Sequence, residues 1–146
     1  MVSRSASVLG VSVLLLCARL PMRAEPLATQ TAFSAGQATA GQTTYEEYCI
    51  ACHQADLGGQ NEALPLKGEH FLRSWGHRTT RDLFAFISTE MPPGQAILSE
   101  AQYLGLVAYL LQSNGATAGS HPLTPTSAAP IQTLVPAVKP DGESEK

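Results

Sequence analysis

Apolar and polar residues recur with a helical period in three stretches of the chain. The clearest stretch covers residues 98–115, and shorter ones cover 43–52 and 79–88. In the longest stretch the apolar side chains repeat every three or four positions, at Tyr103, Leu106, Val107, Leu110 and Leu111. No segment alternates between apolar and polar residues as a half-buried strand would. The pattern therefore predicts an all-α fold.

Each predicted helix begins with a Ser or Thr that is followed three residues later by an acid or an amide. This is the capping-box pattern, in which two side chains satisfy free backbone N–H groups at the helix start. The three pairs are Thr43 and Glu46, Thr79 and Asp82, and Ser99 and Gln102. The last helix is expected to end at Asn114–Gly115, because both residue types favour helix ends.

The first residues have the layout of a secretory signal. Arg4 precedes an apolar run from Val8 to Ala18, which is followed by a polar exit. The run is too short to span a bilayer, which needs roughly 20 apolar residues. We therefore expect residues 1–24 to be a signal peptide that directs the protein to the periplasm, either cleaved or kept as an anchor. Cys17 leaves a lipoprotein anchor as an alternative.

Composition divides the rest of the chain. Residues 25–40 are small and polar and are expected to form a linker. Residues 116–146 are rich in Pro, Ala and Thr and predict a disordered tail, because such a segment buries little apolar surface. The folded domain is then 41–115. A helical domain of this size has a small core and often needs an additional stabilising group.

Charge and motif content exclude some functions. The formal net charge is −3, and removal of residues 1–24 would leave six basic residues against twelve acidic ones, a charge of −6. Nucleic-acid binding is not expected, because it needs clustered Lys and Arg. No pattern typical of a catalytic site or of a small-molecule substrate site occurs, so we do not expect an enzyme.

Cys49, Cys52 and His53 lie within the pentapeptide CIACH, which is compatible with three kinds of chemistry. A zinc site would take His70 or His77 as a fourth ligand, but it usually has a second closely spaced ligand pair, which this chain lacks. A thiol oxidoreductase would place its cysteine pair after a strand and at the start of a helix. The third possibility is covalent haem attachment, for which Cys-x-x-Cys-His is the typical pattern.

Met91 is the candidate for a second iron ligand. It precedes Pro92 in the sequence MPPG, and a residue before proline favours extended backbone. A rigid loop of this kind can hold a weakly binding thioether in place. His70 or His77 in the same role would give bis-histidine iron and a lower potential.

With these motifs, the chain resembles the class I c-type cytochromes over most of residues 41–115. It is most similar to small cytochrome subunits or domains associated with quinoprotein (PQQ-dependent) dehydrogenases. The resemblance implies a cytochrome c-like fold of three or more helices around one haem c. The haem would be bonded to Cys49 and Cys52, and its iron would be ligated by His53 and Met91.

The resemblance also implies roles for other residues. The backbone carbonyl of Pro65 would accept a hydrogen bond from the second ring nitrogen of the iron-ligating histidine. Trp75 and Arg78, together with Arg73, would bond the haem propionates, although core packing for the tryptophan and a solvated surface for the arginines remain open. Close crossing of the first and last helices would bring two pairs of residues together: Gly41 and Tyr45 with Leu106 and Tyr109.

The function implied by the resemblance is one-electron transfer. The protein would take electrons from a dehydrogenase and pass them to an oxidase or another cytochrome of the respiratory chain. Two alternatives remain: a subunit held in a dehydrogenase or oxidase complex, or a haem-based ligand sensor if the sixth iron position is open.

Overall fold

The computed structural model describes residues 31–94 and 97–136, where helices are joined by turns and loops. The helices are α1 (Ala35–Tyr48), α2 (Ile50–His53), α3 (Gly68–Trp75), α4 (Thr80–Glu90), α5 (Glu100–Ser113) and α6 (Ile131–Leu134). Within the described ranges there are isolated bridges but no strand, which confirms the all-α prediction. None of these helices is long and apolar enough to cross a membrane. The predicted signal peptide lies outside the described residues.

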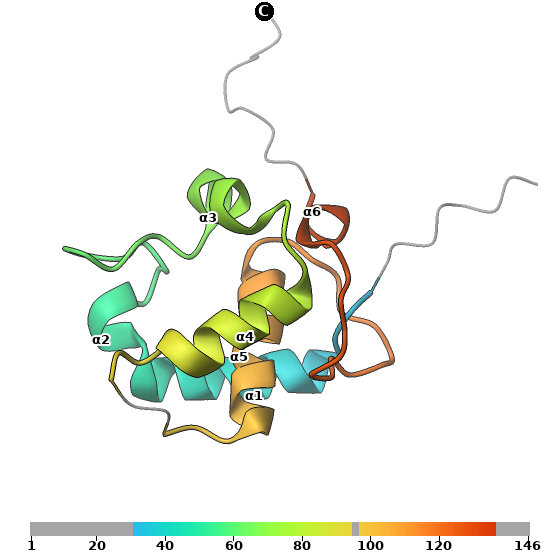
Figure 1. Ribbon diagram of the computed structural model, residues 1–146, viewed down its shortest axis with the longest axis horizontal. Helices are drawn as coiled ribbons and strands as arrows, with labels where there is room; N and C mark the ends of the chain where they lie inside the picture. Colours follow the sequence, from blue (N-terminus) through green and yellow to red (C-terminus); the bar gives the residue numbers. More distant parts are fainter. Residues whose placement is uncertain (1–30, 95–96, 137–146) are drawn as a thin grey trace, which may run out of the picture.

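Helices α1 and α5 cross near the centre of the molecule (Figure 1). Their backbones meet at Gly41 and Gly105, where a Cβ added to Gly41 would overlap the carbonyl of Gly105. One turn further along, the rings of Tyr45 and Tyr109 pack with their centroids 5.2 Å apart and their planes tilted by 47°. The predicted close crossing of the first and last helices is therefore confirmed.

The core is built around α5. Most of the residues of this helix are buried, and they belong to one apolar core cluster with residues from α1, α3 and α4. The buried residues of α5 are Tyr103, Leu104, Gly105, Leu106, Val107, Ala108, Leu110 and Leu111. A helix that is buried on nearly all sides has to be surrounded by the other elements, and this explains the arrangement of the domain.

Two of the three predicted capping boxes are present. The amide of Asp82 donates to the Thr79 hydroxyl at 3.2 Å, and the Thr79 amide donates to the Asp82 carboxylate at 2.9 Å. Ser99 and Gln102 form the same reciprocal pair at the start of α5. The hydrogen bonds that the amide and hydroxyl of Thr79 donate to the Asp82 carboxylate hold the pKa of that carboxyl below its usual range. Sequence-local signals of this kind were sufficient to locate both helix starts.

The start of the first helix was predicted wrongly. Helix α1 begins at Ala35 with Ser34 as its cap, within the segment expected to be a linker. Thr43 lies in the middle of the helix, and its hydroxyl donates to the carbonyl of Thr39 at 3.4 Å. The first half of α1 consists mostly of small residues with little apolar periodicity, so its stability comes from packing on α5 rather than from its own pattern.

The prediction of a disordered tail is also wrong for residues 116–136. This segment is packed onto the domain and includes the short helix α6. Leu123, Ile131, Leu134 and Val135 are all buried in it. The segment has few apolar residues, but all four of its Leu, Ile and Val side chains reach the core, and tertiary contacts of this kind leave no local sequence pattern. The rest of the predicted tail, 137–146, lies outside the described residues.

The helix crossing predicts the effect of one substitution. Gly41→Ala should lower the free energy of unfolding by about 3 kcal/mol or more, because the added methyl group meets backbone atoms that have no rotamer freedom. Gly36→Ala is a matched control in the same helix, because a Cβ there meets nothing within 4 Å. The control should be neutral or stabilising by up to about 1 kcal/mol.

Urea unfolding of both variants followed by far-UV circular dichroism would measure the two effects. Equal stability of Gly41→Ala and the wild type would mean that α1 and α5 do not touch backbone to backbone.

Candidate functional site

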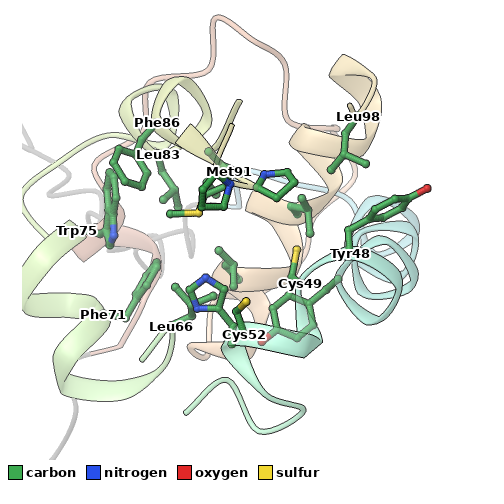
Figure 2. A pocket seen from close by; sticks show the side chains of 17 residues that line it. Tyr48, Cys49, Cys52, Leu66, Phe71, Trp75, Leu83, Phe86, Met91 and Leu98 are labelled. Atoms are coloured by element: carbon green, nitrogen blue, oxygen red, sulfur yellow. The ribbon is translucent and has the colours of Figure 1, made fainter. Parts of the chain in front are cut away.

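An apolar cavity lies between the end of α1 and helix α2 on one side, and α3, α4 and the loop after α4 on the other (Figure 2). Its walls also include residues from the middle of α5. The lining residues are Tyr45, Tyr48, Cys49, Cys52, His53, Leu66, Phe71, Trp75, Leu83, Phe86, Ile87, Met91, Pro92, Pro93, Leu98, Leu106 and Leu110.

A second, larger hollow adjoins this cavity and shares part of its wall, including Cys52, His53, Trp75 and Met91. Its volume is about 780 Å³, which is within the range of roughly 300–1,000 Å³ that is typical of cofactor and small-molecule sites. Its outer wall is more polar and includes Glu62, His70 and Arg78. The two hollows together form one cleft with an apolar interior and a polar mouth.

Both cysteines of the CIACH motif face this cleft. Cys49 ends α1 and caps the start of α2, so the two thiols lie about one helical turn apart. Neither forms a disulfide; Cys49 is partly buried and Cys52 is exposed. Figure 2 shows their sulfur atoms turned toward the same hollow as the sulfur of Met91.

The ring of His53 is held from behind by a backbone carbonyl. Its Nδ1 atom lies 3.2 Å from the oxygen of Leu64, which leaves the other ring nitrogen available to a ligand. The family resemblance implied the carbonyl of Pro65 in this role, and the structure has that of Leu64, one residue earlier. Pro65 favours extended backbone at the preceding residue, so it acts on this contact through the conformation of Leu64.

Met91 lines the cavity on the side opposite the CIACH motif, at the end of α4. It caps the end of α4 with φ −128° and ψ 135°, the extended conformation expected before a proline. Its carbonyl accepts a hydrogen bond of 3.1 Å from the hydroxyl of Tyr103, whose side chain is buried in α5. Met91 was predicted as a ligand from its sequence context, but nothing in the sequence pointed to this hydrogen bond from Tyr103.

Trp75 and Arg78, which were predicted to bond the haem propionates, lie next to each other. Trp75 lines both hollows, packs on Phe86 at a centroid distance of 5.1 Å, and carries the guanidinium of Arg78 over its ring at 5.0 Å. Arg73 lies elsewhere: it forms an exposed ion pair with Glu69 at 2.9 Å. Of the two other histidines considered as iron ligands, His70 lines the larger hollow, whereas His77 lines neither of the two hollows in the described part of the chain.

The two other interpretations of the cysteines find little support in this geometry. Burial, with a smaller contribution from nearby Cys52, raises the pKa of the Cys49 thiol to about 11. The Cys49 thiol is therefore protonated at neutral pH, and the cysteine pair follows helix α1 rather than the strand that would precede it in a thiol oxidoreductase. Across residues 31–94 and 97–136, no three His, Cys, Asp or Glu side chains form a group that could hold a metal ion.

Several residues that line the cavity were not predicted to do so from the sequence. Phe71 on α3 and Leu83 and Ile87 on α4 are buried side chains that line the hollow. Phe71 and Trp75 are four residues apart, and this spacing of two large apolar side chains is typical of a helix such as α3.

The donor set and the lining suit a haem. Two thiols stand at one side of an apolar cleft, and an imidazole and a thioether, both fixed by backbone hydrogen bonds, line its walls. A large flat ring would fill the interior, and its carboxylate groups would find Trp75 and Arg78 at the mouth.

Comparison with known proteins agrees with this geometry. The model of the family described as cytochrome C oxidase, cbb3-type, subunit III matches residues 36–110, more than half of the chain. A search of curated proteins found no match. The matched region starts near the beginning of α1 and ends within α5, so it contains the CIACH motif, the methionine loop and the helix crossing. The chain therefore belongs to this family of c-type cytochromes, all-α electron-transfer proteins that carry covalently bound haem c.

Proposed function

We propose that the protein is a periplasmic one-electron carrier that contains a single haem c. Cys49 and Cys52 would form the two thioether bonds, and His53 and Met91 would ligate the iron. Residues 1–24 would export the chain. The observation that carries this proposal is the convergence on one apolar cleft of the CIACH motif and Met91, which lie far apart in the sequence.

When bound, the haem supplies an iron centre that changes between the ferric and ferrous states by one electron. The protein's contribution is to keep the ligands fixed during that change. Leu64 orients the ring of His53, and Tyr103 holds the backbone of Met91. The apolar walls exclude water, and the soft sulfur of Met91 favours the ferrous state and so raises the potential.

The partners are proposed from the chemistry of the chain. The electron donor would be a dehydrogenase, of which a quinoprotein (PQQ-dependent) enzyme is our first candidate on the basis of the sequence resemblance. The acceptor would be an oxidase or another cytochrome of the respiratory chain. A formal charge of −6 after export favours partners with basic docking faces.

One observation favours a second candidate, a cytochrome subunit held in an oxidase or dehydrogenase complex. The matching family is described as an oxidase subunit. Purification of the tagged protein from its native membranes in mild detergent would separate the two candidates. Recovery with stoichiometric partner subunits would support the complex, and recovery of the cytochrome alone would support the free carrier.

Substitution of the methionine tests the axial ligation. Haem-loaded Met91→Ala should lose the weak far-red absorption band of methionine–ferric coordination. Its potential should fall by on the order of 0.1 V, a fraction of the roughly 0.8 V range that axial ligands control. His70→Ala is the control and should keep both the band and the potential. If the wild type lacks the band, and His70→Ala changes the potential while Met91→Ala does not, the assigned ligand is wrong.

Carbon monoxide distinguishes the carrier from a sensor. The ferrous wild-type protein should bind the gas poorly, because the sixth position is filled, and Met91→Ala should bind it readily. Rapid and tight binding by the wild type would contradict the electron-carrier proposal and favour a haem-based sensor.

The hydroxyl that holds Met91 gives a separate prediction. Tyr103→Phe removes the 3.1 Å hydrogen bond to the Met91 carbonyl but keeps the buried ring. We expect carbon monoxide to bind the ferrous variant at least about threefold faster than the wild type, since a lost hydrogen bond of about 1 kcal/mol loosens the loop by about that factor or more. Tyr109→Phe, on the same helix, is the control and should bind at the wild-type rate.

A further inference from the structure

Residues 116–136 form a strap that lies outside the region matched by the family model. From the end of α5 the strap passes the start of α1 and continues to α6, beside α3 (Figure 1). Its buried side chains include Leu123, Ile131 and Leu134, with exposed fractions of 2%, 0% and 4%. It is therefore part of the folded domain.

The first half of the strap is attached to α1. The side chain of Gln37 donates to the carbonyl of Leu123 at 2.9 Å and accepts from its amide at 2.8 Å. The amide of Gly119 donates to the carbonyl of Phe33 at 2.7 Å. These contacts lie at the N-terminal end of α1, whereas the CIACH motif follows its C-terminal end.

The second half of the strap is attached to the turn between α3 and α4. The amides of Gln132 and Ile131 donate to the carbonyls of Gly76 and Arg78, each at 3.0 Å. In the other direction, the amide of Thr80 donates to the carbonyl of Ala129 at 3.0 Å.

A side-chain contact completes this attachment. The hydroxyl of Thr80, which is fully buried, donates to the carbonyl of Ser127 at 2.8 Å. Four hydrogen bonds thus join the strap to residues 76–80, which comprise the turn after α3 and the first residue of α4.

That stretch carries the polar edge of the cleft. Trp75 ends α3 immediately before it, and the guanidinium of Arg78 lies over the indole ring at 5.0 Å. Both residues line the larger hollow. Because the backbone of the turn is held by the strap, the positions of these two side chains depend on the strap as well.

We infer that the second half of the strap positions Trp75 and Arg78 at the cofactor edge and thereby raises the reduction potential of the protein. This inference rests on the proposed function. The guanidinium of Arg78 favours the reduced state, which carries one positive charge fewer than the oxidised state. Arg78 is exposed to solvent, so its effect depends on how close the turn holds its guanidinium to the cleft. If the strap loosens, the guanidinium moves away from the cleft, the intervening water screens its charge more strongly, and the potential falls.

Two variants separate positioning from general stability. In haem-loaded full-length protein, Thr80→Val keeps the volume of the side chain but removes the donor to Ser127. When the redox potential of the solution is held fixed, the ratio of reduced to oxidised protein should fall at least threefold. Gln37→Ala breaks the first half of the strap instead, and should lower the stability to urea while leaving that ratio unchanged.

A double variant tests whether the effect passes through the arginine. Arg78→Gln should lower the same ratio by at least as much as Thr80→Val. Adding Thr80→Val to Arg78→Gln should then produce a much smaller further change than in the wild type. Equal and additive changes, or a destabilised Thr80→Val protein with an unaltered ratio, would overturn the inference and leave the strap with a stabilising role only.

The wild-type protein provides a test that does not depend on folding of any variant. By linkage, a contact that favours the reduced state must itself be tighter in that state. Amide hydrogen exchange at Thr80, Ile131 and Gln132 should be at least threefold slower in the ferrous than in the ferric protein, with Leu123 unchanged as an internal control. Equal rates in both states would contradict the inference. Absence of covalent haem would instead refute the proposed function, so the two failures are distinguishable.

Discussion

Helices α1 and α5 approach each other so closely at Gly41 and Gly105 that a side chain at Gly41 would overlap the opposing backbone. This contact sets the geometry of the cleft. Helix α1 leads directly into Cys49, and α5 provides Leu106 and Leu110 as the inner wall. A crossing at larger distance would move the cysteine motif away from that wall and widen the cavity.

In the proposed ligation, the haem iron would be bound from opposite sides of this cleft by His53 and Met91, and each of these residues is held by its own hydrogen bond. A backbone carbonyl orients His53, and a buried tyrosine hydroxyl holds the backbone of Met91. Both hydrogen bonds fix where a proposed ligand lies, and neither involves the atom that would bind the iron. Such preorganisation suits electron transfer, because a centre whose ligands do not move needs little rearrangement when its charge changes.

The sequence predicted best what is encoded locally. The capping boxes at Thr79 and Ser99 and the extended residue before Pro92 each depend on a few neighbouring residues, and the structure has all three. Family resemblance added the crossing of α1 and α5, which no local pattern would reveal.

The failures have the opposite character. The early start of α1, the strap after α5 and the hydrogen bond from Tyr103 to Met91 depend on contacts between segments that are distant in sequence. In the strap, single apolar residues separated by prolines and small polar residues look like a disordered tail until the core that receives them is known. The shift from Pro65 to Leu64 is of the same kind, because only the folded loop shows which carbonyl faces His53.

The central claim is that one haem is bonded to the CIACH motif, and the intact mass of the denatured protein tests it most directly. The full chain would be expressed with its signal in a host able to attach haem c, beside the double variant Cys49→Ala/Cys52→Ala. We predict a wild-type mass that equals the polypeptide plus one haem, and a double variant without that addition. A wild-type mass equal to the bare polypeptide would contradict the account.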